Sequence, residues 1–583
     1  GELFADASAL MGDAIVTFPD FPSEIRAPSG SLPGVSGFQV HFGSKSVMTP
    51  GDKADVLVVM NPAALKVNLR ELEPKGLLIV NTGAFNPANL KKALYTSNPL
   101  DDAALEDEYQ VIKVDINALT DEALKDLPLK PALRARCKNF FALGIAFWVY
   151  SRPLDMTLEW IETKWRVNLP MMADANSIAL KAGYIVGENK DVNLPQYTVR
   201  KRVLDDGVYR KITGNEATAL GLIAASENSF RDLVLGSYPI TPATPILETL
   251  AKHRNFNVKT VQAEDEIAAI GVAIGASFAG ALGVTTTSGP GLCLKSEALG
   301  LAVITELPLV VVNVQRAGPS TGLPTKTEQA DLLQTFYGRN GESPVAIIAA
   351  DSPADCFDCA IEAARIALHY RTPVVMLTDT YLANGSEPWK IPNVTDIPDI
   401  SVEPIKHGET YVPYRRDAKT LARRLAVPGR PGFEHRIGGL EKTEAGAVSY
   451  DAENHDKMCR LRAEKVQRIA NDIPPAALLG EKSGQVLVIG WGSTRGAITM
   501  AVERLQAEGA SVSYTHLRHL NPLPKNIGEL MQRFEHVVVP EINLGQLSRI
   551  LRAEYLVDVK SINKVPGRMF LISDLVEGIR QYL

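Results

Sequence analysis

Several loop segments of this chain carry the residue types that could perform chemistry, and the first is GSYPITPATP (Gly236–Pro245). It follows an apolar run and precedes a helical pattern, and its prolines restrict the backbone so that the loop is stiff. A stiff loop would display Thr241 in one orientation toward a ligand. The alternative is an ordinary strand-to-helix turn in which Thr241 or Thr244 caps the helix.

The helical segment EIAAIGVAIGASFAGA begins at the last of three consecutive acids, Glu264–Glu266. Acids in the first turn of a helix complement its dipole, which is the simplest interpretation. The alternative is that one of them is a buried carboxylate directed across an interface. Further along, Gly271, Gly275 and Ala279 recur every four residues, so one helix face is nearly flat and a neighbour can approach closely.

Two further segments place polar groups at the ends of apolar strands. TTTSGPGLCLKSE predicts a strand, a Gly-Pro-Gly loop with Ser288 and Gly289, and a helix start whose N–H groups suit an anion or polar ligand. NVQRAGPSTGLPTKTEQADL puts Arg316 at the end of a strand, followed by a polar loop with Lys326. A guanidinium there suits bidentate carboxylate recognition, although a solvated ion pair explains Arg316 equally well.

The elements that must position these loops follow an α/β rhythm. Strand candidates alternate with helical patterns in three stretches: DVLVV, GLLIVN and YQVIKVD; then DLVLG, VTTTS, LPLVVVNV and PVVMLTD; then GQVLVIGWGS, SVSYTHL and HVVVPEIN. We therefore expect α/β domains over residues 1–190, 214–390 and 484–583, with a linker at 191–213. Residues 391–483 are rich in Pro, Gly and charge, and we expect a connecting segment with one amphipathic helix, DKMCRLRAEKVQRIAND.

Composition excludes several classes of protein. With 583 residues the chain is too long for one core, and 45% hydrophobic with 22% charged residues is typical of a globular protein. A net charge of −6 argues against a nucleic-acid partner. No apolar run approaches the ~20 residues of a membrane span, and the start lacks the features of a signal peptide. These features favour a cytoplasmic enzyme with no membrane partner.

Cysteines are few and scattered. Five occur in the chain: Cys137, Cys293, Cys356, Cys359 and Cys459. Only Cys356 and Cys359 are close together, directly after Ser352 and Pro353, which read as the N-cap and first residue of a helix. We interpret this pair as half-buried helix residues rather than a metal or redox site. A [4Fe–4S] cluster needs four converging thiolates, so we expect none on this chain and assign it no metal ligands.

The segment GWGSTRG (Gly490–Gly496) imitates a dinucleotide-binding fingerprint after the strand QVLVI. A nicotinamide site would require an acid about twenty residues further on, at the end of the next strand. That strand, SVSYTHL, offers none. NAD binding is therefore disfavoured.

Together, YPITP, EIAAIGVAIGA, TTTSGPG and RAGPSTGLPT resemble, in this order, the 2-oxoacid:ferredoxin oxidoreductases. GSTRG and NPLP (Asn521–Pro524) resemble that family's transketolase C-terminal-like domain. FPSEIR (Phe21–Arg26) resembles its gamma-type domain, usually written FGPEIRGG, with Ala27 and Pro28 in place of the glycines. The resemblance covers almost the whole chain, in the order gamma then alpha.

The resemblance implies a gamma-type domain over 1–190 with a possible coenzyme A contact, and a pyrimidine-type thiamine diphosphate domain over 214–390. It also implies a transketolase C-terminal-like domain over 484–583. The beta subunit of the family shares the thiamine diphosphate and holds Mg²⁺ and the [4Fe–4S] cluster. In agreement, the chain lacks a G-D-G motif followed by Asn. We expect an enzyme that is active only with its beta subunit, in an alpha2beta2 heterotetramer, and that reduces ferredoxin.

Site residues follow from the same resemblance. Glu266, rather than Glu264, aligns with the glutamate that activates the cofactor. Arg316 and Thr241 match the positions that hold the substrate's carboxylate and oxo group. The resemblance also implies that Ser288 and Gly289 contact the cofactor. It implies that Tyr238 and Ile240 line the substrate pocket.

The loop PSTGLPTKTEQADL resembles the 2-oxoglutarate branch of the family. This implies oxidative decarboxylation of 2-oxoglutarate with coenzyme A to succinyl-coenzyme A. The direction of the reaction stays open, and the reverse direction would fix carbon dioxide. Lys326 is the candidate cation for the distal carboxylate. The alternatives are a broad-specificity 2-oxoacid:ferredoxin oxidoreductase subunit and a non-catalytic α/β binding subunit. Convergence of Thr241, Glu266 and Arg316 on one domain argues against the latter.

Overall fold

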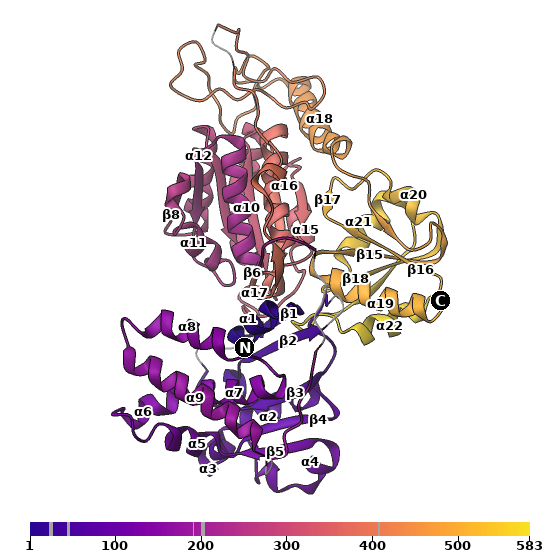
Figure 1. Cartoon of the computed structure of the whole chain (residues 1–583). Helices are drawn as coiled ribbons and strands as arrows, with labels where there is room; N and C mark the ends of the chain where they lie inside the picture. The colour runs from indigo at the N-terminus through magenta and orange to yellow at the C-terminus, as the bar shows by residue number, and fades with distance from the viewer. Residues whose placement is uncertain (23–26, 44–46, 190–191, 200–204, 406–407) are drawn as a thin grey trace. The chain divides into compact units, whose positions relative to one another are not determined.

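The computed structural model describes the chain except residues 23–26, 44–46, 190–191, 200–204 and 406–407 (Figure 1). The described residues form two compact units, Gly1–Lys211 and Ile212–Leu583. No described helix has both the length and the apolar character that crossing a membrane requires. The first unit contains the predicted strands DVLVV, GLLIVN and YQVIKVD, and the second contains all the others.

In the first unit, three parallel strands form a sheet: β3 (Ala54–Val59), β4 (Leu72–Asn81) and β5 (Gln110–Val114). β1 (Ala14–Asp20) and β2 (Gly37–Gly43) form a separate antiparallel pair. The helices are α1 (Glu2–Leu10), α2 (Pro62–Asn68), α3 (Pro87–Lys92), α4 (Ala103–Glu108), α5 (Ile116–Ala123), α6 (Pro131–Arg134), α7 (Lys138–Val149), α8 (Asp155–Trp165) and α9 (Pro170–Glu188). α7 and α9 lie backbone to backbone, because a Cβ at Gly144 would come within 2.1 Å of the Leu180 carbonyl.

The second unit contains a sheet whose described strands run in the order β17-β11-β12-β10-β9-β7-β8. All pairs are parallel except β17 with β11. The strands are β7 (Leu233–Ser237), β8 (Val258–Gln262), β9 (Leu282–Thr287), β10 (Leu309–Gln315), β11 (Ala346–Ala349), β12 (Pro373–Asp379) and β17 (His519–Asn521). Every residue of β9, β10 and β12 is buried, as expected for parallel strands with helices on both faces.

The helices of this part are α10 (Gly214–Ser229), α11 (Thr244–Leu250), α12 (Glu266–Phe278), α13 (Gly289–Leu294), α14 (Ser296–Thr305), α15 (Leu332–Tyr337), α16 (Asp355–Tyr370) and α17 (Thr380–Asn384). α16 begins two residues later than predicted, at Asp355, whose N–H is accepted by the Ser352 hydroxyl. Cys356 and Cys359 are fully buried on α16, so the expectation of half-buried cysteines was wrong. Their helix packs between β12 and α10, which leaves that face no solvent contact.

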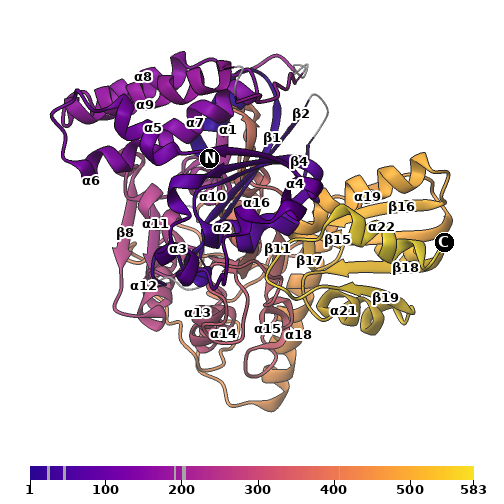
Figure 2. The ribbon, with the colours of Figure 1, turned by 90° about the horizontal axis from the view of Figure 1, so that it is seen from below.

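The C-terminal part forms a second sheet in the order β14-β16-β15-β18-β19. Its strands are β14 (Leu478–Leu479), β15 (Gly484–Trp491), β16 (Val512–Leu517), β18 (Phe534–Glu541) and β19 (Val559–Asn563), and its helices are α19 (Arg495–Ala507), α20 (Ile527–Met531), α21 (Gln546–Tyr555) and α22 (Ile572–Arg580). Figure 1 shows α21 on one side of this sheet and α19 and α22 on the other, and Figure 2 gives the view from below, with the strands running side by side. One hydrophobic core contains residues of both sheets, including Val311, Trp491 and Leu520. The predicted α/β class is confirmed.

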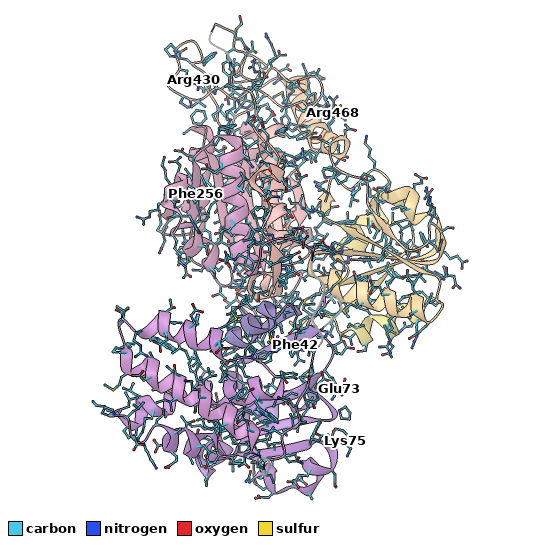
Figure 3. All side chains as sticks on the ribbon, viewed as in Figure 1. Phe42, Glu73, Lys75, Phe256, Arg430 and Arg468 are labelled. Atoms are coloured by element: carbon cyan, nitrogen blue, oxygen red, sulfur yellow. The ribbon has the colours of Figure 1, made fainter. Side chains whose placement is uncertain are left out.

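Between β13 (Ser386–Lys390) and α18 (Ala452–Arg468), the described residues form one short 3-10 helix, η7 (Val394–Asp396), turns and short bridges. α18 is the predicted amphipathic helix, and Arg468 near its end is labelled in Figure 3. Glu306 anchors this part: its fully buried carboxylate pairs with Lys465 at 2.6 Å and Arg416 at 2.5 Å. Burial alone would raise the pKa of Glu306, but these two cations outweigh it and lower the pKa to about 2.

Glu306→Gln should lower the free energy of unfolding by about 3–5 kcal/mol, because it leaves Lys465 as a buried cation without its counter-charge. The folded-state pKa lies below the ordinary value of 4.5, so the stabilisation is present above that pH and is lost as pH falls toward 2. Unfolding in denaturant at several pH values measures both effects. The matched control is Glu464→Gln, which removes an exposed ion pair with Arg468 and should cost less than about 1 kcal/mol. Equal losses in the two variants would contradict the anchoring role.

Candidate active site

The loops singled out in the sequence meet at one edge of the sheet in the second unit. β10, β9 and β7 are neighbours and parallel, so their carboxyl ends lie side by side. The YPITP loop follows β7, TTTSGPG closes β9, and Arg316 directly follows β10. Ligands in open α/β sheets bind at such carboxyl ends.

The structure separates the three acids at the start of α12. Asp265 is the N-cap, and its Oδ1 accepts the Ala268 N–H at 2.8 Å. Glu264 and Asp265 are exposed, whereas Glu266 is buried. A Cβ added at Gly291 would lie 2.8 Å from the Glu266 Cγ and 3.2 Å from its Oε1. The Glu266 side chain is therefore seated against the TTTSGPG loop, where only glycine leaves it room.

Lys295 supports this seat, although nothing in the sequence analysis singled it out. Its fully buried ammonium group donates to the Glu266 carbonyl at 2.8 Å. Burial lowers the pKa of Lys295 to about 8, against the opposing charges of Glu266 and Asp265. A lysine one turn after Gly291 was the available signal, but only the fold shows that it points back to Glu266.

Ser288 is the N-cap of α13 and Gly289 is its first residue, so the Gly-Pro-Gly predicted as a loop forms the first turn of this helix. Ser288 is fully buried, yet its hydroxyl neither caps the helix nor has any hydrogen-bond partner among the described residues. Buried hydroxyls normally have a partner, so this one is available to a polar ligand. The Asp331 carboxylate lies against Gly289, because a Cβ there would be 2.8 Å from Oδ1.

Arg316 is buried and directed across the edge to the YPITP loop. Its Nη1 donates to the Thr241 carbonyl at 2.7 Å, while its Nε has no hydrogen-bond partner in the described part of the chain. Arg316 is 8% exposed and forms no ion pair with another described residue, which disagrees with the solvated ion pair considered above. Burial lowers the pKa of Arg316, opposed by Asp331 and Glu266. The arrangement suits an anionic ligand.

Neither threonine of the YPITP loop caps α11. The N-cap is Ala243, which provides no side-chain bond, and the Thr244 hydroxyl donates instead to the Ile240 carbonyl at 3.2 Å. The capping alternative was therefore wrong, because the helix begins within the proline-rich turn. Thr241 and Tyr238 are exposed. Ile240 is half-buried and directly precedes Thr241, whose carbonyl accepts the Arg316 bond.

Lys326 lies on the loop after Arg316, and its carbonyl accepts the Ala317 N–H at 3.0 Å. Its side-chain stem packs against the C-terminal part, since a Cβ at Gly567 would lie 2.9 Å from the Lys326 Cβ. The FPSEIR segment cannot be placed in a site, because residues 23–26 lie outside the described part.

Comparisons with known proteins agree with this geometry. Residues 230–454 match the family described as "Pyruvate flavodoxin/ferredoxin oxidoreductase, thiamine diP-bdg", and residues 1–186 match "Pyruvate ferredoxin/flavodoxin oxidoreductase". The chain is 50% identical to "2-oxoglutarate oxidoreductase subunit KorA" of Mycobacterium tuberculosis, over 100% of this chain and 89% of that protein. It is 35% identical to "2-oxoglutarate synthase subunit KorA" of Archaeoglobus fulgidus, over 63% of this chain and 97% of that protein.

A solved structure gives the same result: "2-oxoglutarate:ferredoxin oxidoreductase from Magnetococcus marinus with 2-oxoglutarate, coenzyme A and succinyl-CoA bound". It superposes with a TM-score of 0.87 at 29% identity and covers 100% of this chain and 96% of that one. Fold and comparisons thus define an α/β oxidoreductase subunit, whose candidate site lies at the carboxyl edge of a parallel sheet. The chain belongs to the 2-oxoacid:ferredoxin oxidoreductase family, which confirms the resemblance stated from the sequence.

Gly291→Ala should destabilise the second unit by about 1–3 kcal/mol, the usual cost of overpacking a core. Its Cβ would come within 2.1 Å of the Thr287 hydroxyl and would also displace Glu266. Gly300→Ala is the matched control, because its Cβ meets only ordinary contacts at 3.8 Å or more and α14 gains helix propensity. Denaturant unfolding compares the two, and equal stabilities would show that Glu266 does not need the space at Gly291.

Proposed function

We propose that this chain is the large subunit of a 2-oxoglutarate:ferredoxin oxidoreductase. The complex would decarboxylate 2-oxoglutarate oxidatively, transfer the product to coenzyme A as succinyl-coenzyme A, and reduce ferredoxin. The observation that carries the proposal is the 50% identity, over the full chain, to a relative named as a 2-oxoglutarate oxidoreductase subunit. The M. marinus structure, with 2-oxoglutarate, coenzyme A and succinyl-CoA bound, supports the same substrates.

Glu266, Ser288 and Gly289 would hold the pyrimidine side of thiamine diphosphate. The unpartnered Ser288 hydroxyl and the seat of Glu266 against Gly291 fit such a group. When bound, the cofactor supplies the nucleophilic carbon and the electron sink that decarboxylation of a 2-oxoacid needs. Glu266 would hold a proton against the aminopyrimidine ring and act as a general acid–base group. Lys295 fixes the Glu266 peptide and so limits where its carboxyl can point.

Arg316 would bind the carboxylate common to all 2-oxoacids, and Thr241 would contact the oxo group. A planar guanidinium with an unused Nε–H can donate two parallel bonds to a carboxylate. Tyr238 and Ile240 would line the pocket beside them. Lys326 would serve the distal carboxylate, because it lies on the loop that follows Arg316 and its carbonyl accepts the Ala317 N–H.

A beta subunit would complete the site and hold Mg²⁺ and the [4Fe–4S] cluster, in an alpha2beta2 assembly. The surface beside Glu266 supports such a partner. On α12, Ile267 is 56% exposed, and a Cβ at Gly271 or Gly275 would meet nothing within 4 Å. Leu294 on the neighbouring α13 is 51% exposed. An apolar, nearly flat face of this kind suits close packing of another protein.

We also propose the domain division given above, with residues 1–190 as the gamma-type domain that contacts coenzyme A. In the first unit, the ends of β3, β4 and β5 bring polar residues to one sheet edge. Asn61 and Asp115 cap the helices that follow β3 and β5, and Asn81 at the end of β4 is buried. The carboxyl edge of a parallel sheet is where such domains bind ligands.

The purified complex with its beta subunit should reduce a viologen dye with 2-oxoglutarate much faster than with pyruvate or 2-oxobutyrate. Arg316→Ala should lower kcat/KM for every 2-oxoacid, whereas Lys326→Met should lower it for 2-oxoglutarate alone. Each loss should correspond to about 2–5 kcal/mol, the cost of truncating one partner of a desolvated charge pair. Equal effects of Lys326→Met on mono- and dicarboxylates would assign distal recognition to the beta subunit. Preference for another 2-oxoacid would overturn the substrate assignment.

Glu266→Gln should leave thiamine diphosphate bound but slow hydrogen–deuterium exchange at its thiazolium carbon by about 10²–10⁴-fold. The amide keeps the size of the side chain and loses only its acid–base function. Exchange is measured by NMR on the assembled complex after acid quench. Glu264→Gln is the matched control, because the Glu264 side chain lies two residues earlier and is exposed. The thiazolium carbon in this variant should exchange at the wild-type rate. Wild-type exchange in Glu266→Gln would place the activating acid elsewhere.

A further inference from the structure

Asp331 lies at the start of α15 but does not do what an aspartate at that position normally does. An N-cap aspartate accepts an N–H from the first helical turn, which is worth about 1 kcal/mol. The Asp331 side chain makes no such bond. Its Oδ2 instead accepts the Asn313 amide at 2.9 Å, and both carboxylate oxygens lie within 2.9 Å of where a Cβ on Gly289 would be. The carboxylate is turned away from its helix and into the candidate site.

The position of this carboxylate is fixed from two sides. The Gln315 side-chain oxygen accepts the Asp331 N–H at 3.0 Å, so the end of β10 holds the backbone. The Gln546 side chain binds the flanking residues, donating to the Ala330 carbonyl at 2.8 Å and accepting the Leu333 N–H at 2.9 Å. Asp331 therefore cannot swing away from Gly289 without breaking these contacts.

Three titratable or charged groups face Asp331. Arg316 comes from the end of β10, Glu328 from the preceding loop and Cys293 from α13. From the C-terminal part, the neutral Gln546 side chain binds the residues that flank Asp331. Arg316 is the one cation among these groups, so Asp331 and Arg316 dominate the local charge.

Burial raises the pKa of Asp331 to about 6, and the Asn313 bond and the Arg316 charge oppose this rise only in part. The carboxyl therefore changes charge near neutral pH, unlike an ordinary aspartate. An anion bound at Arg316 would raise this pKa further, because it places a second negative charge beside Asp331. Binding of a 2-oxoacid and uptake of a proton are thus coupled in the same direction.

We propose that Asp331 is a positioning residue that sets the charge of the substrate site through Arg316. As a carboxylate it offsets the guanidinium, and as a neutral acid it lets Arg316 bind the substrate's carboxylate more tightly. This inference rests on the proposed function, in which Arg316 receives that carboxylate. It adds that proton uptake at a residue of this chain accompanies substrate binding.

The test uses the complex with its beta subunit and follows KM and kcat for 2-oxoglutarate across the pKa of Asp331. In the wild type, KM should fall about tenfold as pH decreases through this range, the order expected for one nearby charge, while kcat changes less. Asp331→Asn keeps an acceptor oxygen for Asn313 but cannot ionise. It should show the low KM at every pH. A KM profile with the wild-type pH dependence would overturn the proposal.

Asp355→Asn is the matched control, because burial also raises the pKa of this carboxyl to about 6 and it pairs with Arg518 instead. It should keep the wild-type dependence of KM on pH, and loss of that dependence in this variant too would contradict a local origin. A second measurement needs no variant. Calorimetry of N-oxalylglycine, an unreactive 2-oxoglutarate analogue, binding to the wild-type complex in buffers of different ionisation enthalpy should show proton uptake near the pKa of Asp331.

The outcomes separate the two proposals. A wild-type complex that does not oxidise 2-oxoglutarate contradicts the proposed function. A complex that oxidises it, but binds the analogue without proton uptake, contradicts only the role of Asp331. The proton-uptake measurement uses the wild-type complex, so it tests the role of Asp331 even if Asp331→Asn does not fold.

Discussion

Gln329 uses every polar group it has to join the loop after β10 to the C-terminal sheet. Its amide donates to the Trp491 carbonyl at 2.8 Å, and its side-chain oxygen accepts the Ile542 N–H at 3.0 Å. Its own backbone N–H and carbonyl bind Ile542 and Asn543. Because the residue is fully buried, losing any partner would leave an unsatisfied group at a cost of about 1–3 kcal/mol. The loop that carries Arg316, Lys326 and Asp331 is thereby held in place from outside its own sheet.

The network continues to Glu541, which is fully buried and forms no ion pair with any described residue. Its carboxylate accepts bonds from the Trp491 indole, from the Asn543 amide, from the Leu547 and Ser548 N–H groups and from the Ser548 hydroxyl. Fully satisfied polar networks of this kind specify one arrangement of a core. The C-terminal part is therefore a structural support for the candidate site, although none of the proposed reacting groups comes from it.

The buried polar groups discussed above differ in how far neighbouring groups use their charge and hydrogen-bonding capacity. Glu306 and Glu541 have their charge or lone pairs fully occupied by neighbouring groups. The Ser288 hydroxyl and the Arg316 Nε have no hydrogen-bond partner among the described residues, and burial raises the pKa of Asp331. Folding should avoid such incomplete sites unless a ligand completes them. These three groups lie at one sheet edge, beside the exposed apolar face of α12, where a partner and its cofactor would complete them.

The sequence by itself determined the α/β class, the apolar strands named in the sequence analysis and the family, but not strands such as β8, β11 and β19. Continuous apolar runs identify the buried parallel strands. The order of YPITP, TTTSGPG and RAGPSTGLPT identifies the family, although each motif alone is not specific. Only the tertiary structure decided which acid of Glu264–Glu266 is buried, that no threonine caps α11, and that Cys356 and Cys359 are sealed from solvent. Asp331 and Lys295 were missed altogether, although both stand in motifs already singled out. Burial, and with it charge and pKa, depends on what packs against a residue from distant parts of the chain, and local spacing does not contain that information.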